Sequence, residues 1–306
     1  MEETYLGIEI GGTKLQFVSG DRGANISRRW RLTVDPSKGG AGIRQQIEST
    51  LAEILPSGSF GGVAVGFGGP VDWRTGEIVR SHQIEGWTGF GLGEWLRSLT
   101  KLPVRVDNDA NLGALGEAAR GAGRDCDPVF YVTLGSGVGG GLVVGGQIYH
   151  GGKPGESEIG HIRVDRQGTI LESRCSGWAV DARIRAFVKA EPGSMLAQLT
   201  RDVKRGEAKF LFPALRQNDR AAQRILEEVA ADLAFGLSHV THLFHPEIIV
   251  LGGGLSLLGE PLRVAVANAL PCFLMEVFRP GPRIALAALG EDAVPIGALQ
   301  LACQGE

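Results

Sequence analysis

Two glycine-rich turns and one short acidic segment contain the residues of this chain that are best suited to bind a ligand or to catalyse a reaction. The turns lie in Ile8-Glu-Ile-Gly-Gly-Thr-Lys14 and Thr133-Leu-Gly-Ser-Gly-Val-Gly-Gly-Gly141, each after an apolar run, and Val106-Asp-Asn-Asp-Ala-Asn111 lies between them. Glycine leaves backbone N–H groups open to an anion and permits the positive φ that makes them converge. The pattern therefore predicts a clamp for nucleotide phosphates together with a catalytic carboxylate.

The second turn formally matches the dinucleotide-binding pattern GxGxxG at Gly135–Gly140. That pattern requires a helix directly after the turn, because the pyrophosphate binds at the helix N-terminus. Residues Leu142–Tyr149 instead predict a strand and another turn. A protein-kinase glycine loop is a hairpin and fits better locally, but the chain contains no HRD or DFG tripeptide and no Walker A sequence. Both interpretations are therefore disfavoured.

The elements that must position these segments alternate along the chain in the manner of an α/β protein. A hairpin rather than a strand and helix surrounds the first glycine turn, and Glu247–Ser256 repeats the theme of a strand followed by glycines. We expect strands at Tyr5–Ile10, Leu15–Ser19, Val63–Phe67 and Pro103–Val106, and helices near Leu92–Leu99, after Asp109, over Asp219–Phe244 and over Ala293–Cys303.

Composition narrows the class of partner. The 306 residues carry a net charge of −3 with acidic and basic residues interspersed, so we expect a small or neutral substrate rather than nucleic acid. The four cysteines are far apart, which suits a reducing compartment and predicts a cytoplasmic protein. The acidic first residues are unlike a signal peptide, and the stretch 129–152 is too rich in glycine for a membrane helix. We therefore expect no membrane contact.

Five motifs in a fixed order resemble those of the ROK family, whose members include glucokinases, fructokinases, N-acetylhexosamine kinases and sugar-responsive repressors. The motifs are Gly-Gly-Thr-Lys at 11–14, Asn-Asp-Ala-Asn at 108–111, the turn at 133–140, Glu158-Ile-Gly-His161 and Ile248–Gly254. The resemblance runs from about residue 5 to about residue 302. It implies a two-lobed actin-like ATPase (ribonuclease H-like) α/β fold with an inter-lobe cleft. The small lobe would comprise residues 1–112 and 294–306, and the large lobe residues 113–293.

The resemblance implies that the chain transfers the γ-phosphoryl group of ATP to a hydroxyl of a hexose, with glucose as the leading candidate. Asp109 aligns with the family's catalytic base, and Asn108 with a residue that binds a sugar hydroxyl. From the residues alone, Asp109 could instead be the N-cap of the helix that begins at Ala110.

Other functions stay open at this point. They are a sugar-binding ROK protein without catalysis, a kinase of another sugar, a polyol or a cyclitol, and a kinase that uses polyphosphate as its donor. A sugar-sensing repressor is a further class of function in the family. Only eight residues precede Glu9, so we do not expect the DNA-binding domain that a repressor requires.

The remaining site residues follow from the resemblance in two groups. The nucleotide contacts are Gly11, Gly12, Thr13, Lys14, Gly135, Ser136 and Gly137, with Gly252, Gly253 and Gly254 on the adenosine side. The sugar contacts are Gly69, Gln83, Asn108, Asp109, Glu158, His161 and Glu172. Mg²⁺ is expected to neutralise phosphate charge, with Glu9 reaching it through water. Lys14 could instead be a solvated hairpin residue, and Glu172 a surface carboxylate.

Three features depart from the family pattern. Glutamate at position 9 and glutamine at position 83 replace the usual aspartate and asparagine, which puts the metal geometry and the sugar preference in question. Many members also follow the histidine of Glu-x-Gly-His with CxCGxxGC, whose thiolates join a structural zinc. Here Ile162–Arg174 contains no cysteine and Cys175 stands alone. We therefore expect no structural zinc, with His161 acting as a sugar contact or a hydrogen-bonding loop residue.

A second histidine pattern lies near the end of the long predicted helix. His239, His242 and His245 are spaced three apart, but no carboxylate lies at a helpful spacing between them. We expect these side chains to pack in a core or in a subunit contact rather than to bind a metal. The resemblance also suggests a homodimer.

Purified protein is expected to contain no stoichiometric zinc, because the thiolates of the family's zinc motif are missing from Ile162–Arg174. Elemental analysis of protein purified without chelators tests this expectation. One equivalent of zinc per chain would contradict it.

Overall fold

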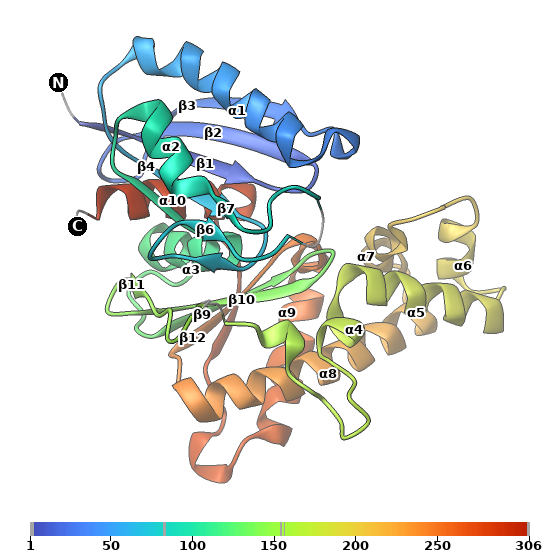
Figure 1. Cartoon of the computed structure of the whole chain (residues 1–306). Helices are drawn as coiled ribbons and strands as arrows, with labels where there is room; N and C mark the ends of the chain where they lie inside the picture. Colours follow the sequence, from blue (N-terminus) through green and yellow to red (C-terminus); the bar gives the residue numbers. More distant parts are fainter. Residues whose placement is uncertain (1–2, 82–83, 154, 156, 305–306) are drawn as a thin grey trace. The chain divides into compact units, whose positions relative to one another are not determined.

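In the part of the chain that the structure describes, the strands form two five-stranded sheets and one small three-stranded sheet. The computed structural model describes residues 3–81, 84–153, 155 and 157–304 (Figure 1). The chain divides into two compact units. Met1–Asp125, Gly141–Ser157 and Ala288–Glu306 form the first unit, and Cys126–Gly140 and Glu158–Ala287 form the second. The lobe boundaries predicted from the sequence stay a prediction.

The sheet of the first unit combines a hairpin with parallel strands. Its order is β3-β2-β1-β4-β8, with β1 at Thr4–Ile10, β2 at Lys14–Gly20, β3 at Ile26–Thr33, β4 at Phe60–Phe67 and β8 at Val104–Asn108. β1 and β2 pair antiparallel around the first glycine turn, which confirms the predicted hairpin. β1, β4 and β8 run parallel, with Ile10 opposite Phe67 and Phe67 opposite Asn108. The carboxyl ends of these strands therefore coincide.

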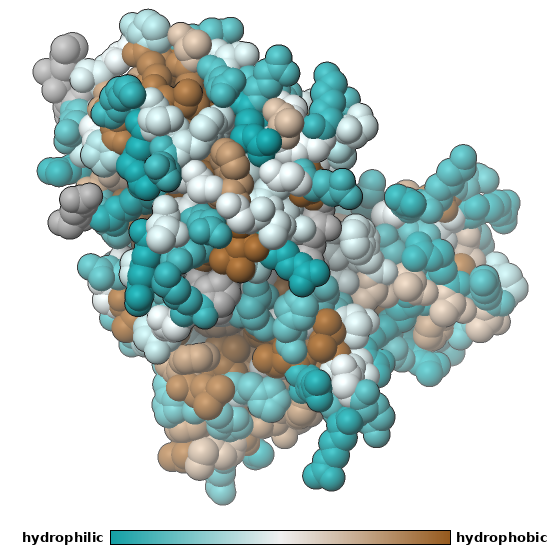
Figure 2. Space-filling view, in the orientation of Figure 1, coloured by the Kyte–Doolittle hydropathy of each residue, from teal (hydrophilic) through white to brown (hydrophobic). Residues whose placement is uncertain are grey.

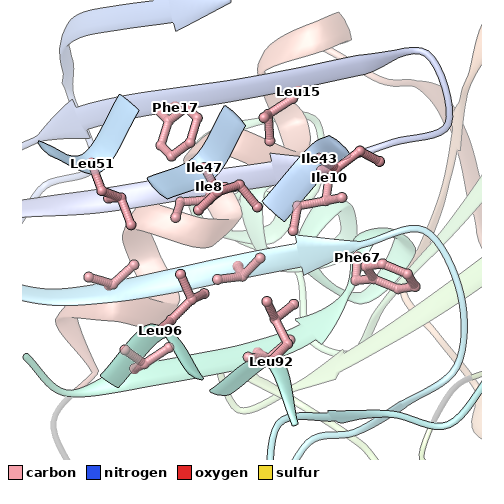
Figure 3. Packing of buried hydrophobic residues seen from close by; sticks show 14 of the residues in the cluster. Ile8, Ile10, Leu15, Phe17, Ile43, Ile47, Leu51, Phe67, Leu92 and Leu96 are labelled. Carbon is pink, nitrogen blue, oxygen red and sulfur yellow. The ribbon is translucent and has the colours of Figure 1, made fainter. Parts of the chain in front are cut away.

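Helices cover both faces of this sheet (Figure 1). Apolar residues of α1 (Gly39–Ile54) and α2 (Leu92–Thr100) share one buried cluster with Ile8, Leu15 and Phe17 of the sheet (Figure 3). On the other face, α10 (Ala293–Cys303) contacts β1 and β4, as its apolar sequence predicts. The small sheet, β5 (Val71–Asp72), β6 (Glu77–Ile78) and β7 (Phe90–Gly91), belongs to the same unit.

α10 and α3 (Asp109–Arg120) approach each other closely because glycines face each other between them. A Cβ added to Gly297 would lie 1.8 Å from the Leu112 carbonyl oxygen, and one added to Gly116 would lie 2.2 Å from the Ala293 carbonyl oxygen. Larger residues at either position would push the two helices apart. The helix that begins beside the proposed base is thus fixed against the last helix.

The second sheet has the order β11-β10-β9-β12-β13. Its strands are β9 (Val129–Leu134), β10 (Val138–Val144), β11 (Gln147–Ile148), β12 (Ile248–Gly252) and β13 (Arg283–Leu286). β12 is buried throughout and pairs parallel with both β9 and β13. β10 continues into residues of the first unit, where it pairs with β11.

The helices of the second unit lie between the strands of this sheet in sequence, α4 to α8 between β11 and β12, and α9 between β12 and β13. They are α4 (Glu172–Cys175), α5 (Gly177–Ala190), α6 (Met195–Thr200), α7 (Leu211–Leu215), α8 (Arg220–Phe244) and α9 (Glu260–Ala269). Asp219 caps α8 by accepting a hydrogen bond from the Ala222 amide at 2.8 Å, and His245 ends it with a φ of 48°. The helix predicted for this stretch is therefore confirmed.

On the face drawn in Figure 2, hydrophilic side chains are interspersed with smaller hydrophobic patches. Within residues 3–81, 84–153, 155 and 157–304, no helix has the length and apolar character needed to cross a membrane. The uncharged stretch 129–152 forms β9, β10 and β11, as predicted.

Glu117 is a fully buried carboxylate at the end of α3, and three backbone amides donate to it: those of Ala122 at 2.7 Å, Ala288 at 3.1 Å and Leu289 at 2.8 Å. Glu117→Gln turns an NH₂ group toward at least one of these donors. The variant is expected to lose about 1–3 kcal/mol of unfolding free energy. Urea unfolding measures this loss.

The exposed Glu48 of α1 offers the same chemical change as a control. Glu48→Gln is expected to stay within about 0.5 kcal/mol of the parent protein. Equal stability of the two variants would show that Glu117 does not anchor the end of α3.

Candidate active site

The first candidate site lies at the carboxyl ends of the three parallel strands of the first unit. Gly11 and Gly12 follow β1, Gly68 and Gly69 follow β4, and Asp109 follows β8. The Gly68 amide donates to the Ile10 carbonyl oxygen at 3.2 Å, and a Cβ added to Gly68 would lie 3.4 Å from Asp109 Oδ2. Ligands of parallel α/β sheets bind at such an edge.

Asn108 is the N-cap of α3, and Asp109 is the first residue of the helix. The Asn108 Oδ1 atom accepts hydrogen bonds from the amides of Ala110 at 2.8 Å and Asn111 at 3.3 Å. Its Nδ2 atom donates to the Gly69 carbonyl oxygen at 3.2 Å. The alternative that Asp109 caps the helix is therefore wrong, because its neighbour fills that role. A carboxylate in the first turn of a helix is stabilised in its anionic form.

The first glycine turn brings Glu9 and Lys14 together. Glu9 Oε1 lies 3.4 Å from Lys14 Nζ, and Glu9 Oε2 accepts a hydrogen bond from Gln16 Nε2. Lys14 is therefore partnered rather than simply solvated. Thr13 is exposed at the tip of the turn. Glycines 11, 12 and 68 line one small hollow together with Ser81 and Trp87.

The second and third glycine turns meet at the edge of the other sheet. The Gly135 amide donates to the Gly137 carbonyl oxygen at 2.9 Å, and its own carbonyl accepts from the Gly177 amide at 2.7 Å. Gly253 has a φ of 78°, and a Cβ there would lie 2.6 Å from the Leu134 backbone. Only glycine combines that φ with so close an approach. The turns after β9 and β12 therefore lie against each other.

These two turns form part of the wall of a cavity of about 1260 Å³ within the second unit. Apolar side chains and cations share its lining, which includes Leu134, Gly135, Ser136, Trp178, Arg185, Lys204, Arg205, Lys209, Phe212, Gly254 and Leu255. The mixture of apolar walls with a few polar groups suits a small-molecule ligand. The cations suit a ligand with negative charge.

Buried carboxylates fasten the cationic part of the wall to α5. The Asp181 carboxylate accepts from the amides of Gly206 at 3.1 Å and Ala208 at 2.7 Å. Arg185 donates to the buried Glu207 at 2.7 Å, in the 3₁₀ helix Glu207–Phe210. The segment that carries Lys204 and Lys209 is therefore held in place without using their charge.

The predicted sugar contacts of the second unit gather around Val138. Glu172 Oε2 accepts a hydrogen bond from the Val138 amide at 2.9 Å, so Glu172 is not a simple surface carboxylate. A Cβ added to Gly160 would lie 2.1 Å from the Val138 carbonyl oxygen. Gly160 belongs to the 3₁₀ helix Ile159–His161, at whose ends Glu158 and His161 are both exposed. Gln83 lies outside the described residues.

The residues considered for a metal have other contacts. Cys175 is fully buried, its Sγ lies 3.8 Å from the Val229 carbonyl oxygen, and burial raises the pKa of its thiol. His242 Nε2 accepts from the Met275 amide at 3.2 Å, while the rings of His239 and His245 pack edge to face against phenylalanines. In the described part of the chain, no group of three or more His, Cys, Asp or Glu side chains is placed to hold a metal ion. The absence of zinc stays a prediction.

The sequence matches the ROK family over residues 5–305. This chain belongs to the ROK family. A relative named glucokinase from Halalkalibacterium halodurans is 33% identical over 318 residues, which cover 99% of this chain and 96% of the relative. A glucokinase from Thermotoga maritima is 29% identical over 304 residues, which cover 97% and 96% of the two chains.

Solved structures show the same relationship. The crystal structure of a ROK family glucokinase from Streptomyces griseus in complex with glucose and AMPPNP has a TM-score of 0.84 and 30% identity, and the match covers 99% of this chain and 100% of that one. The predicted α/β fold class, that of the actin-like ATPases, is confirmed.

Sequence reasoning missed the side chains of the cavity wall. Trp178, Lys204, Arg205 and Lys209 belong to no motif, and the segment between α6 and α7 has no glycine-rich turn that would mark it. The only sequence signal was local, a cluster of basic residues at Lys204–Arg205 after an apolar helix.

Gly253→Ala is expected to weaken binding of AMPPNP about 10-fold or more, because the new Cβ would collide with the Leu134 backbone and displace the turn. Gly259→Ala is the matched control, since Gly259 has a similar φ of 69° and nothing within 4 Å of the added Cβ. Isothermal titration calorimetry gives both affinities. Equal affinities in the two variants would show that the turn does not shape the cavity.

Proposed function

We propose that this ROK protein transfers the γ-phosphoryl group of ATP to a hydroxyl of a hexose, with glucose as the leading substrate. One observation is the main support for this proposal. The strands β1, β4 and β8 end in register, so Gly11, Gly68 and Asp109, which follow them, lie at one edge of the sheet. The relatives named glucokinase, similar over nearly their whole length, support the same activity.

Asp109 is proposed as the general base. Its carboxylate would accept the proton of the attacking hydroxyl while the sugar oxygen bonds to the γ-phosphorus and the bond from that phosphorus to the bridging oxygen breaks, releasing ADP. Asp109 lies in the first turn of α3, where the backbone amides at the helix N-terminus favour a negatively charged side chain. A base in this role contributes about 10²–10⁴ to the rate.

The cavity of the second unit is proposed to hold the nucleotide. Its apolar side chains suit the base and ribose, and its cations suit the phosphates. Within the second unit, Ser136 and Gly137 are proposed to donate to phosphate oxygens beside Gly135, whose own amide donates to the Gly137 carbonyl oxygen. Within the first unit, Gly12 and Thr13 are proposed phosphate contacts beside Gly11, whose amide donates to the Lys14 carbonyl oxygen. Gly252, Gly253 and Gly254 would border the adenosine. Lys14 would act mainly by its ion pair with Glu9.

Mg²⁺ is part of this proposal. The ion keeps several waters and takes one or two carboxylates besides phosphate oxygens. Glu9 fits such a site, because it lies near the end of β1, two residues before Gly11, its side chain is largely buried, and its Oε1 lies 3.4 Å from Lys14 Nζ. When bound, the ion would neutralise charge on the phosphates.

Sugar contacts are proposed within each unit separately. Asn108 uses one Nδ2 hydrogen on the Gly69 carbonyl and has a second for a sugar hydroxyl. Glu158, His161 and Glu172 are proposed as further partners of the hydroxyls, and a site of this kind rejects sugars that leave its polar groups unpaired. Gly69 and Gln83 complete the proposed set.

The compartment and the assembly are also proposals. Free cysteines at four separated positions support a cytoplasmic protein, and membership of the family supports a homodimer. Analytical ultracentrifugation of the purified chain tests the dimer.

Asp109→Asn is expected to lower kcat on glucose by about 10²–10⁴, because the amide cannot accept the hydroxyl proton, while glucose binding changes less than about 3-fold. A coupled ADP-release assay with Mg-ATP measures turnover on glucose, mannose, fructose, N-acetylglucosamine and N-acetylmannosamine. Calorimetry measures glucose binding.

The exposed Asp125 provides the control, and Asp125→Asn is expected to retain parental turnover. Near-normal turnover of Asp109→Asn would contradict the proposed role of Asp109 as general base. Sugar binding without turnover in the parent protein would favour a sugar-binding protein without catalysis, and turnover with polyphosphate alone would change the donor.

A further inference from the structure

Asp107, two residues before the proposed base, is a buried carboxylate with three hydrogen-bond partners. It is 3% exposed. Its Oδ1 atom accepts from the Asn108 amide and from Asn111 Nδ2, both at 2.8 Å, and its Oδ2 atom lies 2.7 Å from His150 Nε2. Because a carboxylate has no hydrogen to donate, the imidazole must carry its hydrogen on Nε2.

His150 reaches this position from a distant part of the sequence. It follows β11, which lies beside α3 (Figure 1). Its side chain is 14% exposed, and its ring stacks on Trp73 with centroids 4.2 Å apart and planes 14° apart. The imidazole is therefore fixed on one face by an aromatic ring and at one nitrogen by the Asp107 carboxylate.

Lys153 and Gly155 make further contacts with the residues around Trp73 and Asn111. Lys153 Nζ forms an ion pair with Asp72, the residue before Trp73. The Gly155 carbonyl oxygen accepts from Asn111 Nδ2 at 3.2 Å, and a Cβ on Gly155 would lie 2.9 Å from the Trp73 ring. Asn111 thus donates both to Asp107 and to the Gly155 carbonyl oxygen.

The partners of Asp107 flank Asp109 in the sequence. Asn108 precedes the base and Asn111 lies two residues after it. The Asp107 carboxylate therefore binds the backbone amide of the residue before Asp109 and the side chain of a residue after it. Loss of the His150 donor would leave one oxygen of a buried carboxylate unpaired, and the group would then seek water or another donor. The first turn of α3 would shift with it.

We propose that His150 is a positioning residue of the transfer step, an inference that rests on the proposed kinase function. By donating to Asp107, His150 completes the hydrogen bonds that orient Asn108 and Asn111, and through them the Asp109 carboxylate. A catalytic group that is misplaced by about 1 Å loses about 10²-fold in rate.

Two substitutions distinguish the effect of the N–H donor of His150 from the effect of its aromatic ring. His150→Phe keeps an aromatic ring for Trp73 but removes the N–H, and His150→Gln keeps an N–H donor but removes the ring. We expect His150→Phe to lower kcat on glucose about 10- to 100-fold, with KM for Mg-ATP within about 3-fold of the parent, because the cavity lies outside this network. His150→Gln is expected to retain kcat within about 3-fold.

His239→Phe makes the same change at an exposed histidine of the second unit and is expected to leave kcat unchanged. Active-site titration with glucose corrects each kcat for the folded fraction.

The double variant Asp107→Asn, His150→Phe is expected to have a kcat at most about 3-fold below that of the slower single variant, because Asp107 and His150 act as one unit.

The outcomes are distinct. Parental kcat in His150→Phe would overturn the inference alone, as would an equal loss in His150→Gln, which would show that packing rather than the donor matters. Fully additive losses in the double variant would also overturn it. Absence of hexose-dependent turnover in the parent protein would reject the proposed function and this inference with it.

Discussion

The register of parallel strands is the constraint on which the rest of the first unit depends. Ile10 lies opposite Phe67 and Phe67 opposite Asn108, so β1, β4 and β8 end at one level. The pairing is buried between helices on both faces, and a slip by one residue would turn the apolar side chains of a strand to the wrong face. Because the register is fixed in this way, short polar segments far apart in sequence become neighbours. The second sheet uses the same device, with Gly252 opposite Thr133.

Glycines and buried carboxylates fix the turns and helices that the strands bring together. Gly253 lets one turn lie on the backbone of another, and Gly297 lets the last helix lie on α3. Asp107, Glu117 and Asp181 each accept hydrogen bonds from two or more backbone or side-chain donors at a point where the chain leaves regular structure. Backbone amides at such points would otherwise lie unsatisfied. These carboxylates are therefore part of the scaffold.

The sequence predicted the elements better than their contacts. The bounds of α10 follow from a stretch that is apolar except at Gln300, and the hairpin around Gly11 follows from two apolar runs separated by glycines. Local propensity could not assign the cap of α3, because Asn108 and Asp109 are both good capping residues and only the register of β8 decides between them. The cavity wall at Lys204 and the contact between His150 and Asp107 depend on long-range packing, for which a single sequence carries no periodic signal.

The order in which the first unit is assembled along the chain bears on its biosynthesis. α10 packs against β1 and β4, yet residues 293–303 leave the ribosome only after the whole stretch 158–287 of the second unit has been made. Domains fold as units while the chain grows. The face of β1 and β4 that α10 covers, together with the matching face of α3, must therefore wait uncovered during most of translation. Nascent chains of this protein have an exposed apolar surface of the kind that chaperones bind, and its burial is among the last steps of folding.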